Sequence, residues 1–218
     1  MLSFDLRAAA PAPQRILAVG CHSDDIEIGC GGTLLTLTRS VTDLHVTWVV
    51  LAAEGVRADE AHASAAAFLA DASSSDIRVL RYRESFLPYD GGQVKEGFEG
   101  LKDAAPDLVF THAREDLHQD HRLASELTWN TFRNHLILEY EIPKYDGDLG
   151  RPNVFVPLDE PVVDDKLRLL ETHFPSQGDK HWFDGELFRG LMRLRGMECA
   201  SRYAEAFACR KLVVHSPS

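Results

Sequence analysis

Two short stretches of histidine and aspartate, more than ninety residues apart, hold the residue types that could carry chemistry in this chain. They are Cys21-His22-Ser23-Asp24-Asp25 and Asp116-Leu117-His118-Gln119-Asp120-His121. Two imidazoles and a carboxylate are the ligands that a hydrolytic zinc site uses while it keeps one position open for water. A carboxylate beside such a site can take a proton from that water. Together, the two stretches predict a metal, a base and a hydrolytic reaction.

In the first stretch, His22 and Asp25 can both reach one metal ion from a loop at the end of a strand. Asp24 lies next to Asp25, and adjacent side chains in a loop point in different directions. Asp24 is therefore free to act as the base on a water molecule. The alternative is a polar loop in which Asp24 or Asp25 caps the following helix.

In the second stretch, His118 and His121 are three residues apart, so they can share one face near the start of a helix. One could bind the metal while the other faces the substrate, stabilises an oxyanion and protonates a leaving amine. Asp120 could accept a hydrogen bond from a histidine ring and fix its tautomer. The alternative is an ordinary helix start whose acidic residues complement the helix dipole.

Strands and helices must place both stretches at one edge of a sheet. Each stretch follows an apolar run that is typical of a buried strand, Ile16–Val19 and Leu108–Phe110. We predict strands over 15–20, 45–51, 77–80, 107–111, 136–141, 154–156 and 208–214. We predict helices over 33–39, 59–70, 94–104, 118–132, 164–173 and 185–196. This alternation predicts an α/β fold, with a mostly parallel sheet covered by helices on both faces.

Glycines follow the first stretch at Gly29, Gly31 and Gly32. We expect them to form a tight turn before the helix over 33–39, because glycine adopts conformations that other residues avoid. Their spacing is not the G-x-G-x-x-G of a dinucleotide-binding loop, and acidic residues precede them.

Length and composition indicate one globular domain over residues 15–218, preceded by a loose Ala/Pro-rich arm over residues 1–14. The net charge of -11 argues against binding to nucleic acid or to an anionic membrane, both of which require basic surface. We find no signal-peptide pattern and no apolar run long enough to span a membrane. The four cysteines show no disulfide-framework spacing, so we expect reduced thiols and a cytoplasmic protein.

These motifs resemble the PIG-L/LmbE family of zinc-dependent N-acetyl-sugar deacetylases. That family carries His-Pro-Asp-Asp-x-x-x-Gly after its first strand and His-x-Asp-His after a later one. This chain has His22-Ser23-Asp24-Asp25-Ile26-Glu27-Ile28-Gly29 and His118-Gln119-Asp120-His121. The likeness continues through Glu54-Gly55, Arg57-Ala58-Asp59-Glu60, His173 with Ser176-Gln177, and Tyr203-Ala204-Glu205-Ala206-Phe207.

The resemblance implies a single-domain Rossmann-like α/β fold and assigns roles to individual residues. It implies zinc bound by His22, Asp25 and His121, although these ligands would also accept Fe²⁺ or Co²⁺. It also implies that Asp24 is the general base and that His118 is the electrophilic or acid partner, oriented by Asp120.

Two positions depart from the family pattern. Ser23 stands where the family usually has a proline, which would stiffen the loop. This difference removes no metal ligand. Glu84 stands where we expect an aspartate. We predict that Glu84, Arg57 and Glu54 contact the substrate, and a phosphate or a sugar hydroxyl would suit Arg57. For Arg57 and Glu54 the alternatives are a solvated helix start and a strand end.

The activity that the resemblance implies is hydrolysis of an N-acetylated amino sugar such as an N-acetylglucosamine derivative, with release of acetate. The sugar could be free, nucleotide-linked, or part of a glycoconjugate or antibiotic precursor. Two alternatives stay open: a zinc amidohydrolase that acts on a non-sugar acyl amine, and a non-catalytic sugar-binding module. Assembly into a homo-oligomer is also open.

Overall fold

The computed structural model describes residues 14–214, which form a seven-stranded sheet in the order β3-β2-β1-β4-β5-β7-β6. The predicted arm over residues 1–14 therefore lies almost wholly outside the described residues. The strands are β1 (Arg15–Gly20), β2 (His45–Val50), β3 (Ser74–Val79), β4 (Leu108–His112), β5 (Leu136–Tyr140), β6 (Val154–Leu158) and β7 (Tyr203–Ala208). β7 runs antiparallel to both of its neighbours, and the other neighbouring strands pair in parallel.

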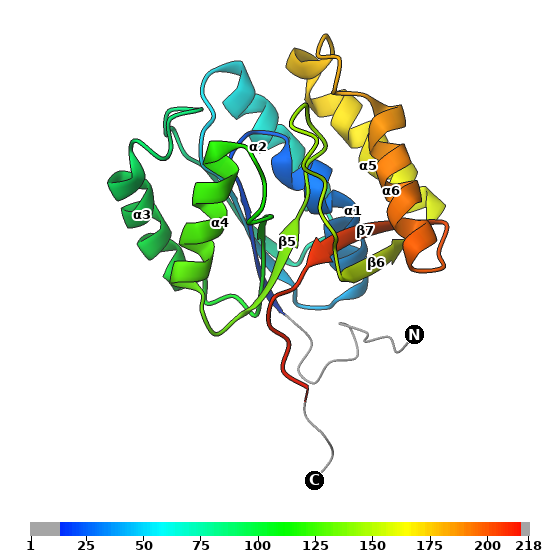
Figure 1. The fold of residues 1–218 in the computed structure, drawn as a ribbon, viewed down its shortest axis with the longest axis horizontal. Coiled ribbons are helices and arrows are strands. Elements are labelled where there is room, and N and C mark those ends of the chain that lie inside the picture. The colour runs from blue at the N-terminus through cyan, green and yellow to red at the C-terminus, as the bar shows by residue number, and fades with distance from the viewer. Residues whose placement is uncertain (1–13, 215–218) are drawn as a thin grey trace.

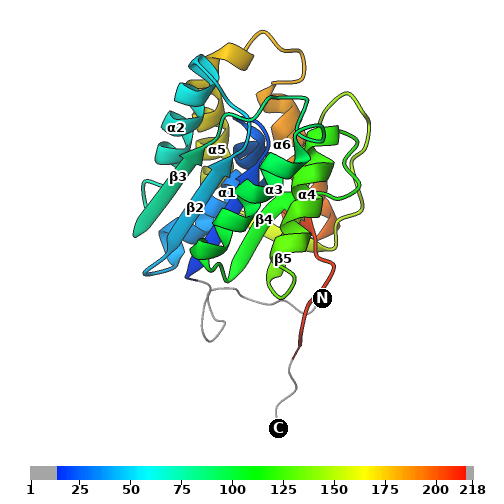
Figure 2. The same cartoon turned by 90° about the vertical axis from the view of Figure 1, so that its left-hand side faces the viewer.

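Helices cover both faces of this sheet, as predicted (Figures 1 and 2). α3 (Gly91–Gly100) and α4 (Gln119–Thr131) contact each other on one face. On the other face lie α1 (Asp25–Ser40), α2 (Val56–Phe68), α5 (Glu160–His173) and α6 (Gly185–Glu198). Short 3₁₀ turns follow α3 and α5 at Leu101–Ala104 and Pro175–Gln177. Among residues 14–214, none of the helices is long and apolar enough to cross a membrane.

The central strands form because their apolar runs are buried on both faces, as parallel strands between two helical layers require. Ile16, Leu17, Ala18 and Val19 are all at most 1% exposed. Their side chains alternate between two apolar cores, one under each helical layer. The strand order is Rossmann-like, and it reverses between β1 and β4. Ligands bind at this point in open α/β sheets.

Two sequence-based predictions were wrong, although the predicted helix over 33–39 lies within α1. α1 begins at Asp25 and contains the glycines that we expected to turn the chain. A Cβ on Gly29 would lie 2.2 Å from the ring of Tyr140, so close packing, and not a turn, explains this glycine. The closing strand is β7, not residues 208–214, where Leu212–Val214 are exposed. The buried Glu205 interrupts the apolar pattern of β7 and concealed that strand.

Candidate functional site

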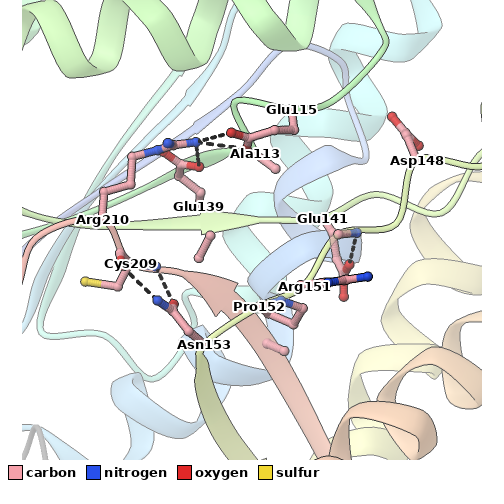
Figure 3. Close-up of a pocket in the computed structure, with 13 residues that line it drawn as sticks. Ala113, Glu115, Glu139, Glu141, Asp148, Arg151, Pro152, Asn153, Cys209 and Arg210 are labelled. Carbon is pink, nitrogen blue, oxygen red and sulfur yellow. Dashed lines mark hydrogen bonds and ion pairs between the residues drawn. The ribbon is translucent and has the colours of Figure 1, made fainter.

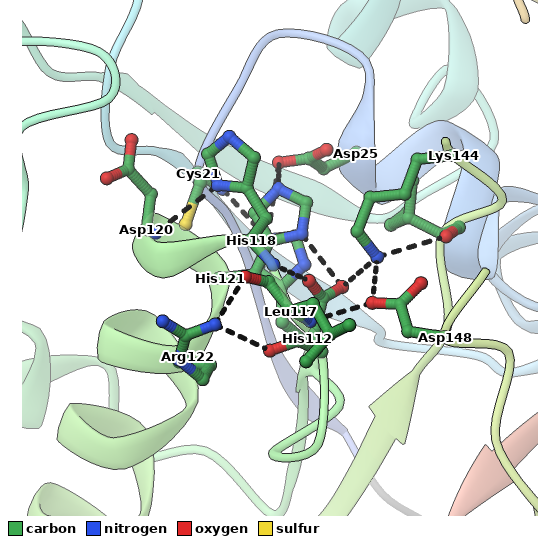
Figure 4. A network of polar contacts seen from close by, with 12 residues as sticks. Cys21, Asp25, His112, Leu117, His118, Asp120, His121, Arg122, Lys144 and Asp148 are labelled. Atoms are coloured by element: carbon green, nitrogen blue, oxygen red, sulfur yellow. Dashed lines mark hydrogen bonds and ion pairs between the residues drawn. The ribbon is translucent and has the colours of Figure 1, made fainter. Parts of the chain in front are cut away.

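The two motifs meet at the carboxyl ends of β1 and β4, which pair directly. Gly20 ends β1 immediately before the first motif, and α4 begins within the second. His22 Nδ1 and His121 Nε2 consequently lie 3.2 Å apart, although 99 residues separate them in the chain. Figure 4 shows the polar network that surrounds this meeting point.

Three predicted metal ligands present their donor atoms as a small triangle. His22 Nδ1 lies 3.4 Å from Asp25 Oδ2, His121 Nε2 lies 3.6 Å from the same oxygen, and the two nitrogens are 3.2 Å apart. Bonds of about 2.0–2.1 Å in a tetrahedral zinc site place ligand atoms about 3.3 Å apart. The donor set and its spacing therefore fit a tetrahedral divalent cation with one position left for water or substrate.

Each of these histidines has an inner nitrogen, which faces the triangle, and an outer nitrogen on the other side of the ring. A carboxylate lies within hydrogen-bond distance of each outer nitrogen. Asp116 Oδ2 is 2.9 Å from His121 Nδ1, and Asp120 Oδ2 is 3.3 Å from His22 Nε2. A proton on the outer nitrogen leaves the lone pair of the inner nitrogen free for a cation, which is the usual arrangement around metal-bound histidine. Both imidazoles are thus oriented to bind metal.

Asp120 differs from the expectation in the ring that it orients. We expected its carboxylate on His118, but it lies against His22 and also accepts bonds from the backbone N–H groups of Ser85 and Leu87. His118 instead accepts the backbone N–H of Asp120 at its Nδ1 atom, 3.3 Å away. This contact caps α4, because a residue at the helix start can satisfy the free N–H groups there.

Asp24 is buried and makes no side-chain capping bond to α1, which removes the capping alternative for this residue. Its Oδ1 lies 3.4 Å from the Arg57 guanidinium, and its Oδ2 has no hydrogen-bond partner among residues 14–214. Burial and the charge of Asp25 raise the pKa of Asp24 to about 6, against the opposing charge of Arg57. A buried carboxylate with one free oxygen is suited to accept a proton.

Asp25 makes no capping bond either, because its Oδ2 accepts the backbone N–H of His22 at 2.7 Å. Burial raises the pKa of Asp25, but the charges of His121, His112 and His22 outweigh it and hold that pKa well below its ordinary value. Asp25 is thus an ionised carboxylate, the form that binds a cation.

A cavity of about 220 Å³ opens over these groups. His118 lines it beside His22 and His121, with ring centroids 4.9 and 4.5 Å away. Burial and the charge of His22 lower the pKa of His118. The predicted substrate residues Arg57 and Glu84 also line this cavity, whereas Glu54 lines an adjoining one. The remaining wall comes from the loop after β5 and from Trp182.

The sequence-based prediction missed three supporting residues. His112, to which the sequence analysis gave no role, is fully buried with its Nε2 atom 3.2 Å from Asp25 Oδ2. Asp116 opens the second motif but received no role. Lys144 Nζ lies 3.0 Å from Asp116 and 2.5 Å from Asp148 (Figure 4). The position of His112 at the end of a predicted strand was the one signal that could have marked it.

A larger cavity of about 570 Å³ lies beside the end of β5 and the residues that follow it (Figure 3). Its carboxylates are already paired within the protein. Arg210 binds Glu115 and Glu139, Arg195 binds Glu141, and Lys144 binds Asp148. It therefore lacks the free carboxylate and the clustered histidines of the smaller cavity, which is the better candidate for chemistry.

Comparison with solved structures supports the fold. The chain resembles N,N'-diacetylchitobiose deacetylase from Pyrococcus horikoshii, with 23% identity, coverage of 94% of this chain and 87% of that one, and a TM-score of 0.73. It also resembles 4-carboxy-2-hydroxymuconate hydratase from Pseudomonas putida, with 16% identity, coverage of 94% and 99%, and a TM-score of 0.74. A zinc-inhibited form of teicoplanin deacetylase shares 16% identity, with coverage of 89% and 97% and a TM-score of 0.68. At these identities the likeness establishes the shared fold, and one fold can serve several reactions.

The family of this chain is shown by its sequence. Residues 17–132, more than half of the chain, match the family described as "PIG-L: GlcNAc-PI de-N-acetylase". The matched segment contains the metal triangle, Asp24 and His118. On this match and this geometry together, the chain belongs to the PIG-L family.

Proposed function

We propose that this PIG-L family N-deacetylase removes the acetyl group from an N-acetylated amino sugar and releases acetate and the free amine. One observation supports the proposal above the others. Three donor atoms 3.2 to 3.6 Å apart lie in a cavity wall, next to a buried carboxylate with a free oxygen. That combination serves hydrolysis of an unactivated amide.

We assign the metal position to His22, Asp25 and His121, and zinc suits two imidazoles and one carboxylate. Fe²⁺ and Co²⁺ would suit the same ligands. A divalent cation bound there supplies a Lewis acid for the acetamide carbonyl and lowers the pKa of water. The structure of one similar deacetylase is described as a zinc-inhibited form. The metal that supports activity in this chain should therefore be measured directly.

The residues around the cavity perform the proton transfers in this proposal. Asp24 takes a proton from the attacking water, and the water oxygen bonds to the carbonyl carbon. His118 donates a hydrogen bond to the oxyanion that develops there. As the carbon–nitrogen bond breaks, Asp24 passes the proton it took to the nitrogen, so that a neutral amine leaves together with acetic acid, which ionises to acetate.

We place the sugar in the cavity of about 220 Å³, where Arg57, Glu84 and Lys144 offer polar contacts and Trp182 and Tyr145 offer apolar surface. The deacetylase structures that resemble this chain act on diacetylchitobiose and on teicoplanin according to their descriptions. They support an amino-sugar substrate and leave its substituent to be identified.

The proposal is tested by acetate release from free, nucleotide-linked and glycoside-linked N-acetyl sugars, with purified metal-loaded protein. Asp24→Asn keeps the shape of the side chain but removes the base, so we expect kcat to fall about 10²- to 10⁴-fold while bound metal is retained. The matched control is Asp103→Asn, at an exposed position outside the site.

The remaining outcomes separate the alternatives. Full activity of Asp24→Asn would reject the assigned base. Turnover confined to non-sugar acyl amines would indicate the amidohydrolase. Sugar binding by metal-free protein, with no turnover after metal is added, would indicate the binding module.

A further inference from the structure

The loop over residues 141–150, between β5 and β6, contributes to two cavities. Residues 142–146 line the cavity of about 220 Å³ beside the metal triangle. Glu141, Asp148 and Gly150 line the larger cavity of about 570 Å³. No residue between 14 and 214 lines both. The loop therefore stands between the space that we assign to the sugar and a larger space that the proposed function leaves unused.

One buried arginine of α6 fixes both ends of this loop. Arg195 donates to the two carboxylate oxygens of Glu141 at 2.6 and 2.9 Å, and to the backbone oxygen of Gly150 at 3.2 Å. Glu141 also accepts the backbone N–H of Gly150 at 3.3 Å, which closes the loop at its base. The tip is different, because Tyr145 is 74% exposed. The base of the loop is thus held independently of its middle.

Two charged side chains hold the middle of the loop (Figure 4). Lys144 Nζ lies 3.0 Å from Asp116 Oδ2 and 2.5 Å from Asp148 Oδ2. Asp148 Oδ2 also accepts the backbone N–H of Leu117 at 2.7 Å. Within the described part of the chain, residues 143–149 form no other hydrogen bond or ion pair with a residue outside the loop. The position of the middle therefore depends on Lys144 and Asp148.

The ion pair between Lys144 and Asp148 lies at the boundary between the two cavities. Lys144 lines the smaller cavity and Asp148 lines the larger one. Both side chains are largely buried, with exposed fractions of 13% and 6%. Removal of one partner would leave the other charge buried and uncompensated, so the intact pair favours one arrangement of the loop. In that arrangement the smaller cavity ends at Lys144.

Lys144 also contacts a residue that supports the metal triangle. Asp116 Oδ2 is 2.9 Å from His121 Nδ1, and Asp116 Oδ1 accepts the backbone N–H of His118 at 2.8 Å. Substitution of Lys144 would therefore disturb both the boundary and the support of His121. Substitution of Asp148 would break the boundary pair and leave the contact between Lys144 and Asp116 in place. The two substitutions thus break the same ion pair from opposite sides with different effects on the metal site.

We propose that the ion pair between Lys144 and Asp148 is a size filter for the substrate. While the pair is formed, the substituent of the amino sugar must fit within the smaller cavity. When the pair is broken, a larger substituent extends past Lys144 into the larger cavity. The identity of the sugar rests on the proposed function, whereas the boundary rests on the contacts of the loop alone. The preferred substrate class is therefore an N-acetyl amino sugar with a small substituent.

The test compares two neutral derivatives of N-acetylglucosamine, the methyl glycoside and the disaccharide in which glucose replaces the methyl group. We expect Asp148→Ala to raise kcat/KM for the disaccharide about tenfold relative to the methyl glycoside, mainly through KM, because the substituent gains space. Lys144→Met should shift this ratio in the same direction. Asp103→Ala, at an exposed position outside the site, is the control and should leave the ratio unchanged. An unchanged ratio in both Asp148→Ala and Lys144→Met would reject the size filter.

Hydrogen exchange tests the contact itself without any turnover. Because Asp148 accepts the Leu117 N–H, Asp148→Ala should speed exchange of that amide about tenfold or more, whereas Asp103→Ala should not change it. Unchanged exchange of Leu117 in Asp148→Ala would mean that this side chain does not hold the loop, which would also reject the size filter.

Calorimetry on metal-free protein separates this inference from the proposed function. If no sugar is deacetylated, but Asp148→Ala tightens binding of the disaccharide about tenfold relative to the methyl glycoside, the size filter stands and the proposed function fails. If both glycosides are deacetylated, and neither Asp148→Ala nor Lys144→Met changes their ratio, the size filter is rejected and the proposed function stands.

Discussion

Each histidine at the metal triangle contacts two charged partners with different tasks. The inner nitrogens of His22 and His121 face Asp25, while their outer nitrogens contact Asp120 and Asp116. A carboxylate on the outer nitrogen makes the inner nitrogen a stronger donor and fixes the ring plane. Lys144 in turn pairs with the buried Asp116. The positive charge of Lys144 balances this carboxylate, which does not itself belong to the triangle. At this scale, we expect metal binding to depend on residues that never touch the metal.

This geometry predicts what Asp120→Asn does. Because Asp120 supports His22 and not His118, the substitution should weaken metal affinity about 10- to 100-fold. Affinity can be measured by competition with a chromogenic chelator. Asp116→Asn, its counterpart on His121, should lose affinity to a similar extent. Unchanged affinity with a lowered kcat would instead mean that Asp120 acts through His118, as the family resemblance implied.

Among the elements, α1 must be positioned accurately, because its first residue is Asp25, a predicted metal ligand. Glu205 of β7 accepts the N–H groups of Gly32 and Thr33, both at 2.7 Å, and Lys166 of α5 donates to the backbone oxygen of Ile28. This buried ion pair inserts between Ile28 and Gly32, whose backbone groups a regular helix would join to each other. Removing either partner alone would leave a buried charge uncompensated. β7 and α5 therefore fix the position of the helix that presents Asp25.

Gly29→Ala tests this packing. The new methyl group would lie 2.2 Å from the Tyr140 ring, and that ring is held by a 2.7 Å hydrogen bond to the backbone oxygen of Val19. We expect the free energy of unfolding to fall by about 1–3 kcal/mol or more, measured by urea denaturation. Gly190→Ala is the matched control in α6, where a Cβ meets nothing within 4 Å and alanine should stabilise the helix by about 0.5–1 kcal/mol. Equal effects at both positions would contradict close packing as the reason for Gly29.

The elements also show what the sequence could and could not predict. β1 matched the predicted strand over 15–20, because a run of apolar residues buried on both sides is visible locally. α1 was predicted too short, since the reason for Gly29 is a ring 111 positions further along the chain. The two motifs, which are local patterns, predicted His22, Asp25, His121 and Asp24 as site residues, and the structure brings the first three within 3.6 Å of one another. His112 and Lys144 were missed because their contacts with Asp25 and Asp116 exist only after β1, β4 and β5 have come together.

Across the whole molecule, the site joins the segment after β1 to the segment after β4, at the point where the strand order reverses. β1 and β4 are paired over only three residue pairs, and beyond them the loop with His22 and the first turn of α4 with His121 are linked through side chains. His22 Nδ1, His121 Nε2 and Asp25 Oδ2 lie 3.2 to 3.6 Å from one another. A bound cation would replace those contacts with bonds that the unfolded chain cannot form.

Metal binding should therefore raise the thermal stability of the entire fold. At a free metal concentration about 100 times Kd, the gain is about 2.7 kcal/mol. For a domain of this size it corresponds to a rise in Tm of about 5–10 °C. Differential scanning calorimetry with and without a chelator measures this rise. His121→Gln should lose most of it, because a triangle ligand is gone, whereas His62→Gln, on α2 and outside the site, should keep it. If His121→Gln kept the full rise in Tm, the cation would bind elsewhere. His121 is the only triangle ligand that follows β4, so without it a cation on His22 and Asp25 would no longer link β1 to β4.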